Sequence, residues 1–222
     1  MANNTTNKET WQVRATAWEL LALSFRYPEV VLAQAVASGE WTEAAREVAD
    51  ALDLELPVDF GEGVVAGDPD TLLHTLRAEA TRLFVGAPDP VVSPYEGVHR
   101  AADDGVQALL FVNAHSMAVE RFMKSCGLGR PEGTNEPLDH VATECELLQY
   151  LATLAAGAKP PAHITLDALP GGSLEEAYAT FLEEHAQIWL PRFAEAVAVE
   201  TREPFYRNAA SFMIALLSSH VL

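Results

Sequence analysis

Residues 136–144 read Glu-Pro-Leu-Asp-His-Val-Ala-Thr-Glu and stand between a glycine-rich turn and an apolar run. Proline has no amide proton and a preset φ, so Pro137 suits the first turn of a helix. The apolar pattern continues to about Ala156, and the glycine at 157 is a typical stop. The stretch therefore predicts a helix from Pro137 to about Ala156, with polar side chains in its first turn.

The polar residues Asp139, His140 and Glu144 make this helix start unusual. Unpaired amides and the helix dipole favour a carboxylate in the first turn and favour a neutral imidazole next to it. His140 and Glu144 are one turn apart, so they share a face. Two interpretations follow: Asp139 is a helix cap and His140 a hydrogen-bonding wall residue, or the pair lines a binding pocket.

Composition restricts the class of protein. With 222 residues, 49% of them hydrophobic, the chain can bury a full core as one domain or as two closely joined lobes. It has 14 Lys and Arg against 32 Asp and Glu, a formal net charge of −18. Nucleic acid is not an expected partner, because phosphates require clustered basic residues. A cationic peptide would be attracted.

The cysteines and the N-terminus favour a cytoplasmic protein. Cys126 and Cys145 are too few for a disulfide framework or a four-ligand zinc site, so we expect both to be small buried residues. Residues 1–8 are polar, lack the apolar core of an export signal, and are expected to form a flexible tail. No apolar run reaches the roughly 18 residues that span a bilayer, so stable membrane insertion is not expected.

Apolar residues recur at helical spacing through most of the chain, and strand signals are confined to short pieces. The loop 86–95 contains three prolines and is not expected to be helical. Residues 9–222 are therefore predicted to form an all-α, single helical-bundle domain of about ten helices, with sub-lobes 9–130 and 131–222 as the alternative division. The expected helices cover residues up to about 27, 29–38, 41–54, 69–84, 104–126 and 137–156, with further helices starting at Ser173, Pro191 and Pro204.

No catalytic motif stands out in the sequence. The glycine-rich stretch 61–67 follows no convincing strand and has one residue too many for a dinucleotide loop. A nucleophile elbow, a P-loop and a zinc-protease motif are absent. His140 and Glu144 would supply only two ligands to a metal. We therefore expect no enzyme activity, no metal and no resident cofactor.

Several segments, taken together and in order, resemble the TorD/DmsD/NarJ family of redox-enzyme maturation chaperones. They are Thr81–Gly86, Ser93–Glu96, Glu136–His140 with Glu144, and Phe181–Phe193 followed by Pro204–Tyr206. The resemblance covers nearly the whole chain. It implies an all-helical cytoplasmic chaperone that binds the twin-arginine signal peptide of a molybdopterin oxidoreductase's catalytic subunit and assists cofactor insertion before export or assembly. It also implies a monomer or a domain-swapped dimer, and a link to anaerobic respiration.

The resemblance further implies a signal-peptide site. Its members are Phe25, Leu83, Phe84, Pro94, Tyr95, Glu96, His99, Asp139, His140 and Glu144. The apolar members would contact the apolar segment of the leader, and the carboxylates of Asp139 and Glu96 would accept hydrogen bonds from its arginines. Gly97 stands where the family usually has serine, and His99 where it usually has an aromatic residue.

Other functions are left open by the sequence. Guanine nucleotide binding has been suggested for some members of the family, and contact with molybdopterin is conceivable. One alternative is therefore a small GTP-binding protein or enzyme that uses a pocket around Asp139 and His140. Another is a purely structural helical adaptor, in which the polar cluster is only a cap.

Overall fold

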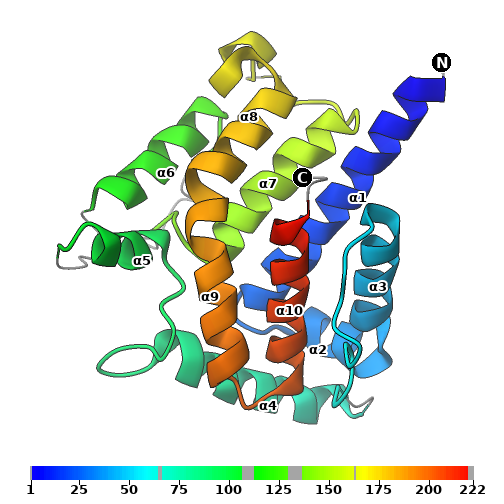
Figure 1. Cartoon of the computed structure of the whole chain (residues 1–222), viewed down its shortest axis with the longest axis vertical. Coiled ribbons are helices and arrows are strands. Elements are labelled where there is room, and N and C mark those ends of the chain that lie inside the picture. Colours follow the sequence, from blue (N-terminus) through cyan, green and yellow to red (C-terminus); the bar gives the residue numbers. More distant parts are fainter. Residues whose placement is uncertain (1, 65–66, 107–112, 130–136, 163, 220–222) are drawn as a thin grey trace. The chain divides into compact units, whose positions relative to one another are not determined.

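The computed structural model describes residues 2–64, 67–106, 113–129, 137–162 and 164–219, the first five of these in their backbone only. Over these ranges the regular structure is helical, with one isolated antiparallel bridge between Tyr95 and His140 (Figure 1). The predicted all-α class is confirmed. The helices are α1 Ala2–Phe25, α2 Val30–Ser38, α3 Glu40–Leu52, α4 Pro69–Ala80, α5 Glu96–Asp103, α6 Ala114–Ser125, α7 Val141–Ala155, α8 Leu174–Phe181, α9 Gln187–Glu200 and α10 Pro204–Ser218.

Short non-α turns join some of these helices. Two single π-helical turns, η1 Thr81–Val85 and η4 Leu182–Ala186, follow α4 and α8 directly. Two 3₁₀ turns, η2 Leu166–Ala168 and η3 Pro170–Gly172, interrupt the linker before α8. A π-turn widens a helix locally and is often found at functional sites.

The chain forms two compact units. The first contains residues 1–18 and 95–189, and the second contains residues 19–94 and 190–222. Each unit therefore takes residues from both sides of position 130. Helix α1 includes most of residues 1–8, which were expected to form a flexible tail.

The first unit is packed around aromatic residues of α1 and α8. The Trp18 indole donates a hydrogen bond to the Tyr178 hydroxyl over 2.7 Å, and the Trp11 and Tyr178 rings meet edge to face at 5.0 Å. Phe181 and both cysteines are also buried. The prediction of buried cysteines is confirmed. Burial raises the pKa of the Cys126 thiol to about 11, which leaves it protonated at neutral pH.

The second unit is packed around two aromatic groups. Phe25, Phe84, Phe193 and Tyr206 lie with neighbouring ring centroids 5.2 to 6.2 Å apart. A second group forms around Trp41, whose ring contacts Phe60, Phe205 and Phe212, and it meets the first group through the rings of Phe205 and Tyr206, 5.2 Å apart. Such ring contacts add about 0.5–1.5 kcal/mol each beyond the burial of their area.

Several helix ends follow the sequence signals. The Asp68 carboxylate accepts a hydrogen bond from the Thr71 amide over 2.9 Å and starts α4. The Ser173 hydroxyl accepts one from the Glu176 amide over 3.1 Å and starts α8. Pro204 is the first residue of α10. These predictions are confirmed because each depends on hydrogen bonds or φ angles within a single turn.

Two helix predictions are wrong. The expected helix 104–126 is not continuous from its start: α5 ends at Asp103, and α6 begins at Ala114, with the Asn113 side chain accepting from the Ser116 amide over 2.7 Å. Residues 107–112 lie outside the described ranges. Pro191 does not start a helix but lies inside α9. The nearby residues Leu190 and Phe193 are fully buried, so packing outweighs the missing amide of the proline.

Within the described ranges, no single helix has the length and apolarity of a membrane span. The bent pair Asn7–Phe25 and Val30–Ser38 meets those criteria only when the two helices are taken together.

Candidate functional site

Helix α7 begins at Val141, four residues later than predicted, and His140 is its N-cap. The imidazole Nδ1 of His140 accepts a hydrogen bond from the Ala142 amide over 3.1 Å. An Nδ1 atom that accepts a hydrogen bond uses its lone pair and carries no hydrogen. In this geometry the ring is therefore neutral, with its hydrogen on Nε2. The helix starts late because the cap is His140, and neither Pro137 nor Asp139 lies in the helix. Glu136, the first residue of the quoted stretch, lies outside the described residues.

Asp139 connects the starts of three helices. Its Oδ2 accepts hydrogen bonds from the Gly97 amide over 2.9 Å and from the Ser116 hydroxyl over 2.6 Å. Its backbone carbonyl accepts a third from the Glu96 amide over 3.0 Å. The interpretation of Asp139 as the cap of α7 is therefore wrong: the residue fixes α5 and α6 against the start of α7.

The Asp139 carboxyl has no exposed surface. Its Oδ1 atom has no hydrogen-bond partner among the described residues. Burial raises the pKa of Asp139, and the bonds from Ser116 and Gly97 act in the opposite direction. A fully buried carboxyl of this kind holds neighbouring backbone in place at a cost in desolvation.

Glu96, the first residue of α5, is a second fully buried acid. Its Oε1 accepts a hydrogen bond from Arg100 over 2.7 Å, and the His185 Nδ1 lies 2.9 Å from its Oε2. Arg100 also donates to the Glu184 carbonyl over 3.0 Å. Residues 184 and 185 both belong to the π-turn η4, so Glu96 and Arg100 together join α5 to this turn.

Glu144 is the third fully buried acid. Its Oε2 accepts a hydrogen bond from the Trp189 indole over 2.9 Å. Burial, followed by the charges of Glu96 and Asp139, raises the pKa of Glu144 well above its usual range. Ionising all three of these buried carboxyls together would have a high energetic cost, so the fold favours the neutral acid at Glu144.

Replacing Glu144 with glutamine is expected to stabilise the protein at neutral pH. Glutamine keeps an oxygen for the Trp189 indole and cannot ionise. Because the pKa of Glu144 is raised in the fold, its stabilising contribution is present below the ordinary value of 4.5 and is lost as pH rises toward the folded value. The advantage of the variant should therefore be small near pH 4 and grow by up to about 1.4 kcal/mol per pH unit above it.

Urea unfolding at several pH values measures this effect. Glu43→Gln, which removes an exposed carboxyl of α3, is the matched control. A gain from Glu144→Gln that is the same at pH 4 and pH 7 would show that the carboxyl is not held neutral by the fold.

Tyr95 and two histidines provide the accessible part of this cluster. Tyr95 pairs with His140 through the antiparallel bridge, and their rings meet nearly perpendicular with centroids 5.3 Å apart. The His99 ring lies over Trp189 at 5.2 Å. All three of these side chains are half-buried, whereas Glu96 and Glu144 are fully enclosed.

The remaining expected site residues belong to the second unit. Phe25 and Leu83 are buried, and Phe84 is half-buried with its ring 6.2 Å from that of Phe25. The Leu83 carbonyl accepts a hydrogen bond from the Val92 amide over 2.9 Å, which ties the proline loop to the π-turn η1. Pro94 at the end of this loop is buried. The structure thus groups Phe25, Leu83 and Phe84 in one unit and the polar members with Tyr95 in the other.

Sequence reasoning missed four residues that hold the polar cluster together. Arg100 could have been found, because it follows Glu96 by one helical turn. Ser116, His185 and Trp189 carry no local signal, since their partners are 23, 89 and 45 residues away in the chain.

Packing explains why position 97 is a glycine in this structure. A Cβ atom at this position would collide with the side chain of Asn113, which caps α6. The side chain of Asn113 occupies the space that a serine at position 97 would need. The packing of Asn113 therefore accounts for glycine at this position, where the resemblance led us to expect serine.

Comparison with known proteins gives consistent matches. The family model described as "Nitrate reductase delta subunit" matches residues 35–195. A chaperone protein TorD of Vibrio cholerae serotype O1 is 28% identical over 142 residues, which make up 64% of this chain and 59% of that protein. The TorD of a second strain is 27% identical over the same length. The match thus spans about three fifths of these curated relatives.

A solved structure shares the fold. It is the crystal structure of an Archaeoglobus fulgidus protein described as a redox enzyme maturation protein. The two structures superpose with a TM-score of 0.54 and 19% sequence identity, covering 91% of this chain and 93% of the other.

Proposed function

Because the chain belongs to the nitrate reductase delta subunit family, we propose that it is a chaperone for the maturation of a molybdenum-containing oxidoreductase. It binds the twin-arginine signal peptide of the catalytic subunit in the cytoplasm and assists cofactor insertion before export or assembly. It acts as a monomer or a domain-swapped dimer. The curated relatives are named chaperones, which supports this proposal.

The observation that carries the proposal is the fixed pairing of Tyr95 with His140. The two half-buried rings are joined by a backbone bridge, and the buried carboxyl of Asp139, next to His140, accepts a hydrogen bond from the Gly97 amide. Such a surface is preorganised, so little entropy is lost when a peptide binds. Rigid aromatic anchors of this kind commonly provide most of the binding energy at an interface.

The acids contribute to the proposed site indirectly. Glu96, Asp139 and Glu144 have no exposed surface and already bond to groups within their own unit. We therefore assign them a positioning role, in place of the direct contacts with leader arginines expected from the sequence. We assign the direct contacts with the leader to Tyr95, His99 and His140. Phe25, Leu83, Phe84 and Pro94 belong to the second unit, and their contact with the leader stays a prediction.

Electrostatics suits the proposed partner. A leader with an arginine pair ahead of an apolar segment is attracted by the net charge of −18. This attraction increases the association rate more than the affinity, and salt screens it. Apolar contacts would contribute about 1.5–3 kcal/mol for each fully buried side chain before the costs of ordering are subtracted.

Calorimetric titration with a synthetic twin-arginine leader tests this function. We expect saturable binding at low salt and weaker binding when both arginines are replaced by glutamine. The absence of binding to the arginine leader would contradict the proposal. A parallel titration with fluorescently labelled GTP tests the alternative function, because saturable GTP binding would favour a nucleotide-binding protein.

A further inference from the structure

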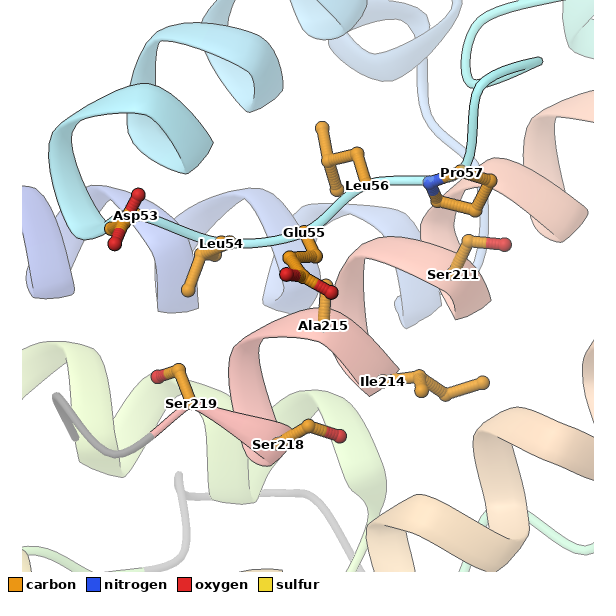
Figure 2. A pocket seen from close by; sticks show the side chains of 10 residues that line it. All are labelled: Asp53, Leu54, Glu55, Leu56, Pro57, Ser211, Ile214, Ala215, Ser218 and Ser219. Atoms are coloured by element: carbon orange, nitrogen blue, oxygen red, sulfur yellow. The ribbon is translucent and has the colours of Figure 1, made fainter.

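The second unit contains an open cleft of about 860 Å³ (Figure 2). One side is the irregular segment 53–57 that follows α3, and the other is the last part of α10, from Ser211 to Ser218, with Ser219 directly after it. The cleft contains none of the residues assigned to the leader site. It is therefore a separate candidate for binding.

The segment 53–57 offers free backbone groups to a ligand. Asp53 ends α3 with a φ of 53°, and the Leu54 amide donates to the Ala49 carbonyl over 2.9 Å. The Pro57 carbonyl accepts from the Phe60 amide over 3.0 Å. Between these two bonds, the amides of Glu55 and Leu56 have no protein partner within the described part of the chain. Neighbouring amides of an extended segment point to opposite sides, so a peptide lying beside the segment could pair with one of the two, as a strand pairs with an open edge.

The two charged residues described in the lining of the cleft, Asp53 and Glu55, are both acidic. Asp53 and Glu55 are exposed, and neither forms a salt bridge among the described residues. Among the described residues that line the cleft there is no lysine, arginine or histidine. The lining thus carries two uncompensated carboxylates, which favour a cationic ligand.

The rest of the lining is mainly apolar. Leu54, Leu56, Ile214 and Ala215 provide alkyl surface on both sides (Figure 2). The Ser219 hydroxyl is buried and has no hydrogen-bond partner among the described residues. An extended peptide places alternate side chains on opposite sides. Basic residues on one side and apolar residues on the other would therefore match this lining.

We propose that this cleft binds an extended cationic peptide segment with alternating apolar side chains, supplied by the catalytic subunit from a region outside its leader. The assignment of the peptide to the catalytic subunit depends on the proposed function, whereas its cationic and apolar character is inferred from the lining of the cleft alone. A second copy of this chain is a poor occupant, because two molecules of charge −18 repel each other.

The test uses the full chain and a short synthetic peptide in which arginine alternates with valine. We expect saturable binding, weakened about tenfold in the double variant Asp53→Asn/Glu55→Gln, since each exposed ion pair contributes a few-fold in affinity. Asparagine tolerates the left-handed backbone at position 53, so the variant should fold normally. Glu47→Gln/Asp50→Asn removes the same charge from the exposed face of α3 and should leave the affinity nearly unchanged.

Three results would overturn the inference. A peptide with glutamate in place of arginine could bind equally well, the cleft variant could bind as tightly as the wild type, or both double variants could lose affinity equally.

Competition with a twin-arginine leader then tests the source of the peptide. Simultaneous binding of both peptides is expected, whereas displacement would assign the cleft to the leader. Failure of the leader to bind, with the cleft peptide still bound, would refute the proposed function and the source while leaving the cleft's chemistry in place.

Discussion

Replacing Tyr95 with alanine should weaken binding of a twin-arginine leader by about 30-fold or more, with little change in folding. A central aromatic anchor commonly contributes 2 kcal/mol or more to an interface, which corresponds to this factor. The ring is half-buried against His140, and the backbone bridge between the two residues does not depend on the side chain. Alanine therefore removes contact surface without removing a main-chain support. Calorimetric titration with the leader measures the loss.

Two further variants define the role of Tyr95. Tyr95→Phe keeps the ring and should retain most of the affinity if apolar contact dominates. Met117→Ala removes an exposed apolar side chain of α6 in the same unit and should have no effect. Unchanged leader affinity in Tyr95→Ala, with a normal melting temperature, would show that this residue has only a structural role.

Replacing Glu96 with alanine should destabilise the protein by about 3–5 kcal/mol, the usual cost of breaking a buried ion pair from one side. The change removes the acceptor of Arg100 and of the His185 ring, which is 6% exposed. Part of this loss of stability is offset, because Glu96 is one of the charges that raise the pKa of Glu144. Without Glu96, Glu144 can ionise more readily. Urea unfolding with linear extrapolation measures the net effect.

The double variant Glu96→Ala/Glu144→Gln tests that coupling. If the two carboxyls repel each other, the gain from Glu144→Gln should shrink once Glu96 is absent, and the two effects will not add. Glu43→Ala, on the exposed face of α3, should change stability by no more than about 0.5 kcal/mol. A loss below about 1 kcal/mol in Glu96→Ala would mean that the buried carboxylate is dispensable for the fold.

The helices that could be predicted are those whose signals lie within one or two turns. Asp68 and Ser173 cap their helices, and Pro204 opens the last one, as their local chemistry requires. The start of α7 was predicted too early, because Pro137 suits a first helical turn on local grounds and no local signal marked His140 as the cap. Only the position of the neighbouring helices decides that Asp139 bonds to Gly97 and Ser116 and leaves the cap to His140.

The sequence by itself determined the all-α class, because apolar residues at helical spacing specify which face of each helix is buried. It also pointed to Asp139, His140 and Glu144 as an unusual polar group, to which the family resemblance added Tyr95. Only the tertiary structure decided that Glu96, Asp139 and Glu144 form one enclosed cluster, with hydrogen bonds to groups 23 to 89 residues away. The physical reason is that periodicity and capping act within a few residues, whereas burial and the partners of a buried charge depend on how distant helices pack.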